Sequence, residues 1–199
     1  MLHRTIAVLC IAATLPAGAS EDKALEGAAL TKALRQGGYT LYIRHAATDG
    51  DQRDRNVVLE DCATQRNLGA EGRGQARRIG AAIAALKLPV GEVIAGPYCR
   101  TRDTAMLLAG RAQVAQAVAG LRSPTGALDF SELGRILATP PAAGTLRIVA
   151  GHEPSHAFAH APKLEEGEAM LVLASAGDWK VVARIRADDW ERLAALPAS

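Results

Sequence analysis

The sequence contains few aromatic residues: two Phe, two Trp and three Tyr, or 4% of its 199 residues. A core built from this chain therefore depends on small aliphatic side chains that pack closely. An excess of charge of one sign is also lacking, because 23 Lys and Arg oppose 21 Asp and Glu. A net charge of +2 gives no reason to expect nucleic acid or an anionic membrane surface as a partner.

The apolar stretch near the start of the chain, residues 5–15, is too short to span a bilayer, which needs about 20 residues. It follows a weakly positive start and precedes small residues that end at Ala19, as in an export signal cleaved at that point. We therefore expect residues 1–19 to be a signal peptide and residues 20–199 to be one domain. The mature protein is then periplasmic or secreted, without stable membrane insertion. A buried N-terminal helix is the alternative.

Cysteine is also scarce, with three residues, and Cys10 falls in the expected signal peptide. In an exported protein, the remaining pair of Cys62 and Cys99 is expected to form a disulfide. Such a bond closes a loop of about 38 residues and stabilises the fold by roughly 3 to 4 kcal/mol. The alternative is two reduced, partly buried thiols.

Apolar runs alternate with segments of helical spacing along the rest of the chain. We expect strands at residues 39–43, 90–95, 114–121, 146–150, 170–174 and 179–185. We expect helices at residues 21–36, 70–86, 101–110, 130–138 and 188–196, and one beginning at Pro154. This alternation predicts an α/β fold, a three-layer α/β/α sandwich with a mainly parallel sheet.

Three glycines, Gly72, Gly74 and Gly80, interrupt the expected helix at residues 70–86. Each weakens a helix by roughly 1 kcal/mol relative to alanine. We therefore expect the backbone to approach another segment closely at these positions.

Histidines and arginines follow the expected parallel strands. They are Arg44 and His45 after residues 39–43, Arg100 and Arg102 after residues 90–95, and His152 after residues 146–150. Because the carboxyl ends of parallel strands form the ligand crevice, we expect these side chains to meet. Arginine pairs bind phosphoryl oxygens through paired N–H donors. The sequence therefore predicts a phosphate site containing Arg44 and either Arg100 or Arg102.

The two histidines suit phosphoryl transfer. One attacks phosphorus as a neutral ring, and the other, protonated, stabilises the transferring group. This chemistry needs no metal and no cofactor. His156 and His160 lie four residues apart on an expected helix, a spacing that can bind a metal, but no third ligand accompanies them. We read them as surface residues.

The polar segment of residues 48–68 shows no sustained periodicity and is expected to be a long loop. It carries Arg53, Arg55 and Arg66, which either extend the anion site or are solvated on the loop. Loops of this length are usually functional or disordered, and the basic residues favour a function.

These segments resemble the histidine phosphatase superfamily, the phosphoglycerate mutase-like proteins, over nearly the whole mature chain. Arg44-His45-Ala46 matches the Arg-His-Gly signature, and residues 68–76 match Leu-Thr-x-x-Gly-x-x-Gln-Ala. Residues 96–105 match Ser-Pro-x-x-Arg-Thr-x-x-Thr-Ala. His152 matches the second histidine, and residues 167–169 match Gly-Glu-Ala. The resemblance implies a phosphoglycerate mutase-like fold and a phosphatase that works without a metal.

The resemblance also implies roles for individual residues. His45 is the nucleophile that forms a phosphohistidine, and His152 stabilises the phosphoryl group. The motif favours Arg100, together with Arg44, as the phosphate ligand and leaves Arg102 as the alternative. Arg53 or Gln52 could replace an asparagine that the family often has after its signature.

The sequence departs from the family pattern at two further places. Ala46 replaces a glycine, which requires an ordinary negative φ at that residue. The general-acid glutamate of many members has no clear match. Glu153, directly after His152, is the candidate that resembles the acid phosphatase branch, and Asp129 and Glu132 are its rivals. For all three, a cap or surface role is the alternative.

We expect an exported phosphomonoesterase that acts on a small-molecule phosphoester. A phosphate-binding module that has lost turnover is the alternative, because of the altered glycine and the unmatched general acid. The sequence identifies neither the natural substrate nor the oligomeric state.

Overall fold

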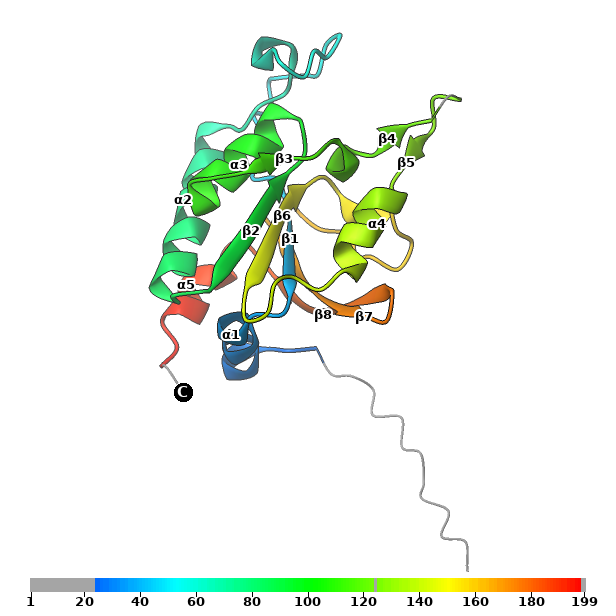
Figure 1. The fold of residues 1–199 in the computed structure, drawn as a ribbon. Helices are drawn as coiled ribbons and strands as arrows, with labels where there is room; N and C mark the ends of the chain where they lie inside the picture. Colours follow the sequence, from blue (N-terminus) through cyan, green and yellow to red (C-terminus); the bar gives the residue numbers. More distant parts are fainter. Residues whose placement is uncertain (1–23, 124, 198–199) are drawn as a thin grey trace, which may run out of the picture.

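A computed structural model describes residues 24–123 and 125–197, so the expected signal peptide lies outside the described residues. Its main sheet has six strands in the order β3-β2-β6-β1-β7-β8 (Figure 1). The parallel strands are β1 (Thr40–Arg44), β2 (Val90–Ala95), β3 (Gln113–Val114) and β6 (Leu146–Gly151). β7 (Ala169–Ser175) and β8 (Asp178–Ile185) form an antiparallel hairpin at one edge. The mainly parallel sheet is confirmed.

Helices cover both faces of this sheet (Figure 1). On one face lie α1 (Gly27–Gln36), α2 (Ala70–Ala85), α3 (Cys99–Ala109) and α5 (Asp189–Ala194). On the other face lies α4 (Ser131–Ala138). The three layers therefore agree with the expected sandwich.

The alternation of side chains along the central strands separates the two cores. Leu41 and Ile43 pack with the four-helix face, whereas Tyr42 between them packs with α4. Likewise, Ile148 packs with the four-helix face and Val149 packs with α4. Successive residues of a strand point to opposite faces, so a strand buried on both sides reads as a continuous apolar run.

The carboxyl ends of the three central parallel strands lie side by side. Arg44 is paired with Gly151, and Ala95 with Ala150. Whatever follows these strands therefore emerges at one edge of the sheet. This register brings residues separated by about a hundred positions to one place.

Two expected elements are wrong. The strand at residues 114–121 is a 3-10 turn, η2 (Gln116–Ala119), followed by β4 (Leu121–Arg122), which forms a small hairpin with β5 (Leu128–Asp129). Alanine and glutamine are poor strand formers, and Ala117 and Val118 are buried by the turn.

The helix expected from Pro154 is only η3 (Pro154–His156). The Glu153 carboxylate accepts hydrogen bonds from Ser155 N and Leu164 N, and this holds a compact loop in place of a helix. His156 and His160 consequently do not share a helix, and His160 instead packs on the Trp179 ring. Within the described ranges, no group of three His, Cys, Asp or Glu side chains is arranged to hold a metal ion.

Close backbone approach accounts for two of the three glycines in α2. A Cβ at Gly72 would overlap the carbonyl of Ala47, and one at Gly80 would lie 2.7 Å from Leu107 O. At Gly74 it would meet only the Arg78 side chain, so the expectation is wrong there. Gly72 thus lets the start of α2 press against the segment that follows β1.

The long loop after β1 is tied to α3. Cys62, in η1 (Cys62–Thr64), forms a disulfide with Cys99, with a Cα–Cα distance of 5.8 Å, as the sequence predicted. The buried Gln65 adds a second tie, because its Oε1 accepts a hydrogen bond from Cys99 N.

None of the helices in residues 24–123 and 125–197 has the length and apolar character needed to cross a membrane.

Candidate active site

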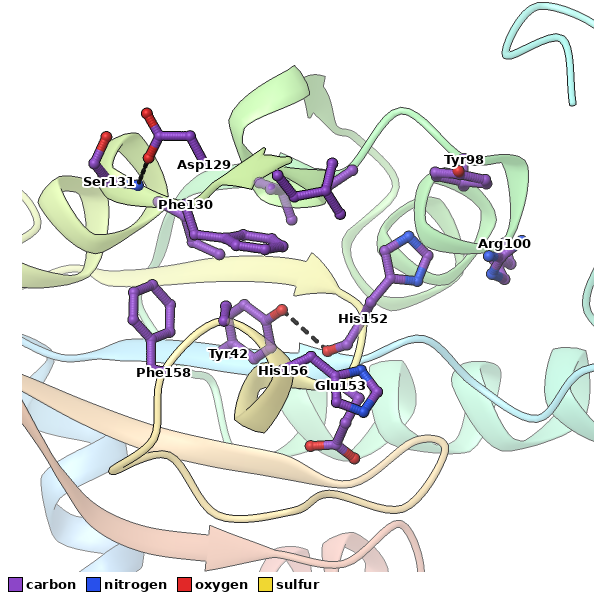
Figure 2. A pocket seen from close by; sticks show the side chains of 15 residues that line it. Tyr42, Tyr98, Arg100, Asp129, Phe130, Ser131, His152, Glu153, His156 and Phe158 are labelled. Atoms are coloured by element: carbon purple, nitrogen blue, oxygen red, sulfur yellow. Dashed lines mark hydrogen bonds between the residues drawn. The ribbon is translucent and has the colours of Figure 1, made fainter. Parts of the chain in front are cut away.

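The two histidines predicted to form the site lie together. His45 directly follows β1 and His152 directly follows β6, and their ring centroids are 5.5 Å apart at an interplanar angle of 77°. The Tyr98 ring packs edge-on against His152 at 4.9 Å. Figure 2 shows His152 with Tyr98 and Arg100 to one side of it.

The surroundings of His45 fix its tautomer. Its Nδ1 lies 3.0 Å from the carbonyl oxygen of Ala46. Because a carbonyl can only accept a hydrogen bond, Nδ1 carries the proton, and in the neutral ring the lone pair is on Nε2. Burial lowers the pKa of His45 to about 4, and the charge of Arg100 acts in the same direction. His45 is therefore a neutral imidazole with a free Nε2 lone pair near neutral pH.

His152 is also neutral in the free site. Burial is the main cause that lowers its pKa to about 3, followed by the charge of Arg100. The protonated state expected from the sequence therefore requires an anion to offset the neighbouring guanidinium charge.

Two guanidiniums lie beside the histidines, since the charges of Arg44 and Arg100 lower the pKa of both rings. Arg44 Nη1 donates to Leu164 O at 2.6 Å and to Glu153 Oε2 at 3.4 Å. Arg100 Nη1 and Nη2 donate to the two carboxylate oxygens of Asp54 at 3.2 and 3.3 Å. In both cases a carboxylate holds the end of the guanidinium.

The remaining donor edges of the site lack partners. Within the part of the chain that the structure describes, five buried side-chain nitrogen or oxygen atoms have no hydrogen-bond partner, and three of them are Arg44 Nε, Arg100 Nε and His152 Nε2. A buried polar atom without a partner is unfavourable by about 1 to 3 kcal/mol. A tetrahedral oxyanion bound beside the His45 ring would give all three atoms a hydrogen-bond partner.

The comparisons with known proteins agree with this geometry. The sequence pattern of the histidine phosphatase superfamily (branch 1) matches residues 40–123, which include Arg44, His45 and Arg100. Over these residues the chain is similar to the histidine phosphatase superfamily.

Solved structures of two other proteins have a similar fold. The protein histidine phosphatase SixA, complexed with tungstate, superposes with a TM-score of 0.57 at 16% identity, over 76% of this chain and 98% of that one. A SixA protein from Agrobacterium tumefaciens gives a TM-score of 0.52 at 13% identity, over 74% and 96% of the two chains. At these identities the likeness concerns the fold. No curated protein matches the sequence.

The structure decides between the two arginines of α3. Arg100 faces the histidines, whereas Arg102 Nη2 donates to the sulfur atoms of Cys99 and Cys62 at 2.9 and 3.5 Å. Residues two apart on a helix point to nearly opposite sides, so only one of the pair can enter the crevice. Arg102 as a phosphate ligand is therefore wrong.

Arg53 is not part of the site either. Its exposed guanidinium donates to the carbonyls of Gly50 and Gln52 within its own loop. Arg66, from the other end of the loop, does lie at the site, with Nη2 3.7 Å from Glu166 Oε1. Spacing from the signature favoured Arg53, but the fold of the loop decides which arginine reaches the crevice.

Glu153 lies behind Arg44, and the structure does not present it as a proton donor. Its buried carboxylate accepts hydrogen bonds from Ser155 N, Ser155 Oγ and Leu164 N, in addition to its contact with Arg44. These contacts occupy both of its carboxylate oxygens. Its position fits a role in orienting Arg44.

The rival carboxylates are also unsuited to donate a proton. Hydrogen bonds from Ser131 lower the pKa of Asp129, and Glu132 pairs with Arg135 on the exposed side of α4. A general acid near neutral pH needs a raised pKa. Asp129 has the opposite environment.

Ala46 fits where the family has glycine. It is buried and is not among the described residues with positive φ, so the condition stated for this substitution is met. Its backbone N–H donates to Thr104 Oγ1, and that hydroxyl donates to Arg100 O. Thr104 therefore links the segment after His45 to the first turn of α3 at Arg100.

Glu166 is a residue of the site that sequence reasoning missed. Its carboxylate lies 3.9 Å from both His45 Nδ1 and Arg44 Nη2, and it accepts two hydrogen bonds from Thr48. The Gly-Glu-Ala match pointed instead to Glu168, which pairs with Arg184 away from the histidines. Glu166 lies on a loop with no motif of its own, so no local signal was available.

Proposed function

We propose that this protein is an exported phosphomonoesterase that hydrolyses its substrate through a phosphohistidine on His45. The observation that carries the proposal is the set of unpartnered donor atoms on Arg44, Arg100 and His152 beside the free lone pair of His45. A phosphoryl group between them would give each buried polar atom a partner.

In the first step, His45 Nε2 attacks phosphorus while the ester P–O bond breaks and its electron pair leaves with the alcohol oxygen. Arg44 and Arg100 neutralise the charge of the transferring oxygens, and His152 contributes a third hydrogen bond. The departing oxygen takes up a proton from solvent. In the second step, water attacks phosphorus and releases a proton to solvent, while the P–N bond breaks and its electrons return to Nε2. The products are inorganic phosphate and the free alcohol.

Two carboxylates support this chemistry from behind the guanidiniums. Glu153 holds Arg44 and Asp54 holds Arg100, so both donor groups are oriented before substrate binds. Preorganised donors stabilise transferring charge without having to reorient during the reaction.

Export is supported by two observations. The first residues of the sequence have the pattern of a signal peptide, and the disulfide between Cys62 and Cys99 is typical of an oxidising compartment. A periplasmic or secreted phosphatase would meet small-molecule phosphoesters outside the cytoplasm.

The test measures hydrolysis of a generic aryl phosphate by wild type, His45→Ala and the control His160→Ala, whose ring packs on Trp179 away from the site. We expect wild type and the control to turn over and His45→Ala to be inactive. An acid-labile phosphoryl adduct should form on wild type and on the control, but not on His45→Ala. Equal activity of wild type and His45→Ala would remove the proposal.

A phosphate-binding module without turnover remains the second candidate. It is favoured by the lowered pKa of Asp129, since a poor leaving group needs a proton donor. Tight binding of vanadate by wild type, with no hydrolysis of any phosphoester tested, would support this candidate over the enzyme.

A further inference from the structure

We propose that the preferred substrate is a phosphate monoester of a flat aromatic alcohol, and that its ring binds in an aromatic cavity beside His152. This inference rests on the proposed function, because it assigns the part of the substrate that leaves when His45 is phosphorylated.

The cavity begins at the phosphate site and has a volume of about 680 Å³. Pockets that enclose small organic ligands typically span about 300 to 1,000 Å³. Arg100 and His152 lie at its inner end, and its walls are mainly apolar, formed by Tyr98, Val118, Leu128, Phe130, Leu133 and Phe158. Figure 2 shows Phe130 and Phe158 on the side of His152 opposite Tyr98 and Arg100.

The aromatic walls are built into the fold. The sequence has two phenylalanines in all, and both line this cavity. The Phe130 ring lies over Gly120, where a Cβ would come within 2.9 Å of it. The Phe158 ring packs edge-on against Trp179 at 5.2 Å and against Phe130 at 6.5 Å. Both phenylalanines of a chain with few aromatic residues therefore lie at this cavity.

The charges in the cavity exclude a second anionic group on the substrate. Of the described residues that line it, Arg100 is the one guanidinium, and it is committed to the phosphoryl end. Asp129 lines the cavity and is ionised, because hydrogen bonds from Ser131 lower its pKa. A bisphosphate or a carboxylated phosphoester would place its second anion in an apolar cavity with a carboxylate as neighbour.

The carboxylates near the histidines indicate the same class of leaving group. Glu166 accepts two hydrogen bonds from Thr48, which lower its pKa, so it has no proton to give to a departing oxygen. The Glu153 carboxylate is occupied by four hydrogen-bond contacts from Ser155 and Leu164. A phenolic oxygen leaves without protonation far more readily than an alkoxide, so the site suits an aryl ester.

Binding of phosphonates, which cannot be hydrolysed, tests the cavity without relying on turnover. Calorimetry on the purified protein compares (1-naphthylmethyl)phosphonate with methylphosphonate. We expect the naphthyl compound to bind about 30-fold more tightly, because its ring is buried. Phe130→Ala should weaken it about tenfold and leave methylphosphonate unchanged. The exposed Met106→Ala on α3 is the control and should alter neither.

A second variant covers the case in which Phe130→Ala fails to fold. Ala157→Leu places three further carbons in the cavity and should weaken binding of the naphthyl compound alone. Kinetics then compare 2-naphthyl phosphate with phenyl phosphate, whose leaving groups are similarly acidic, and we expect about tenfold higher kcat/KM for the larger ester.

The outcomes separate this inference from the proposed function. Equal affinity for the two phosphonates, or equal kcat/KM for naphthyl and phenyl phosphate in an active enzyme, overturns the aromatic cavity and leaves the phosphatase intact. Absence of all hydrolysis, together with selective naphthylphosphonate binding, overturns the phosphatase and supports the cavity as a ligand site.

Discussion

The Asp54 carboxylate binds the end of the Arg100 guanidinium through two hydrogen bonds. Oδ1 accepts from Nη1 at 3.2 Å and Oδ2 from Nη2 at 3.3 Å, while Nε of the same guanidinium is buried without a partner. Paired contacts of this kind fix the orientation of arginine. Asp54 comes from the long loop and Arg100 from α3, so a loop residue determines where the phosphate ligand points.

We therefore predict that Asp54→Asn raises KM for an aryl phosphate about tenfold, with a smaller change in kcat, because Arg100 is no longer held for the phosphoryl oxygens. Steady-state kinetics and inhibition by inorganic phosphate measure the effect. Asp51→Asn, an exposed change on the same loop, is the control. A lower KM in Asp54→Asn would mean that this carboxylate competes with phosphate and does not position Arg100.

The pH dependence of activity follows from the low pKa of His45. A ring whose pKa is about 4 in the free site stays neutral through the mildly acidic range. We predict that kcat/KM, corrected for ionisation of the substrate, stays constant from pH 7 to about pH 5 and falls near pH 4. A pH–rate profile measures this. A fall centred near pH 6.5, the ordinary histidine value, would contradict the buried neutral nucleophile.

Stability should depend on pH through the same two histidines. The folded-state pKa values of about 4 for His45 and about 3 for His152 lie below the unfolded value of 6.5. As pH falls below 6.5, the unfolded chain therefore binds protons first, and stability present above that pH is lost. Between pH 7.5 and 5 the loss is about 2 kcal/mol for each histidine.

Urea unfolding at both pH values measures this loss. The double variant His45→Gln, His152→Gln should lose less stability on acidification than wild type, by roughly 4 kcal/mol. The exposed His156→Gln serves as the control and should keep the wild-type difference. An unchanged difference in the double variant would show that these rings do not contribute.

Two neighbouring glycines of α2 should respond oppositely to alanine. Gly72→Ala brings a Cβ into the carbonyl of Ala47, so we predict a loss of more than about 2 kcal/mol in the free energy of unfolding. Gly74→Ala meets only the Arg78 side chain and gains helix propensity, so we predict a gain of up to about 1 kcal/mol. Denaturant unfolding of the two variants measures both effects, and equal effects would refute the close approach at Gly72.

The disulfide should contribute to stability and to phosphate binding. Replacing Cys62 and Cys99 together by serine should lower the free energy of unfolding by roughly 3 to 4 kcal/mol, because the loop is no longer closed in the unfolded chain. KM should also rise, since Arg100 is next to Cys99 and its partner Asp54 lies in the long loop that the bond ties to α3. Thermal unfolding and kinetics measure the two effects. A stable variant with unchanged KM would show that Gln65 alone holds the loop.

The sequence by itself determined the sheet and the residues at its carboxyl edge. Strands such as residues 39–43 and 146–150 are continuous apolar runs, and a run buried on both faces needs no distant information to be recognised. His45 and His152 follow these runs directly, so the register of a parallel sheet is sufficient to bring them together. The disulfide could also be predicted from the sequence, because a chain with few cysteines allows few pairings.

Only the tertiary structure decided which loop residues complete the site. Asp54, Glu166 and Arg66 approach the histidines because loops are held by distant hydrogen bonds, such as those made by Gln65 and Glu153, which no local pattern encodes. The choice of Arg100 over Arg102 depended on the direction in which α3 begins. Loop conformation and helix rotation arise from contacts between distant segments, whereas strand periodicity arises from neighbouring residues, and this difference separates what the sequence determined from what the fold added.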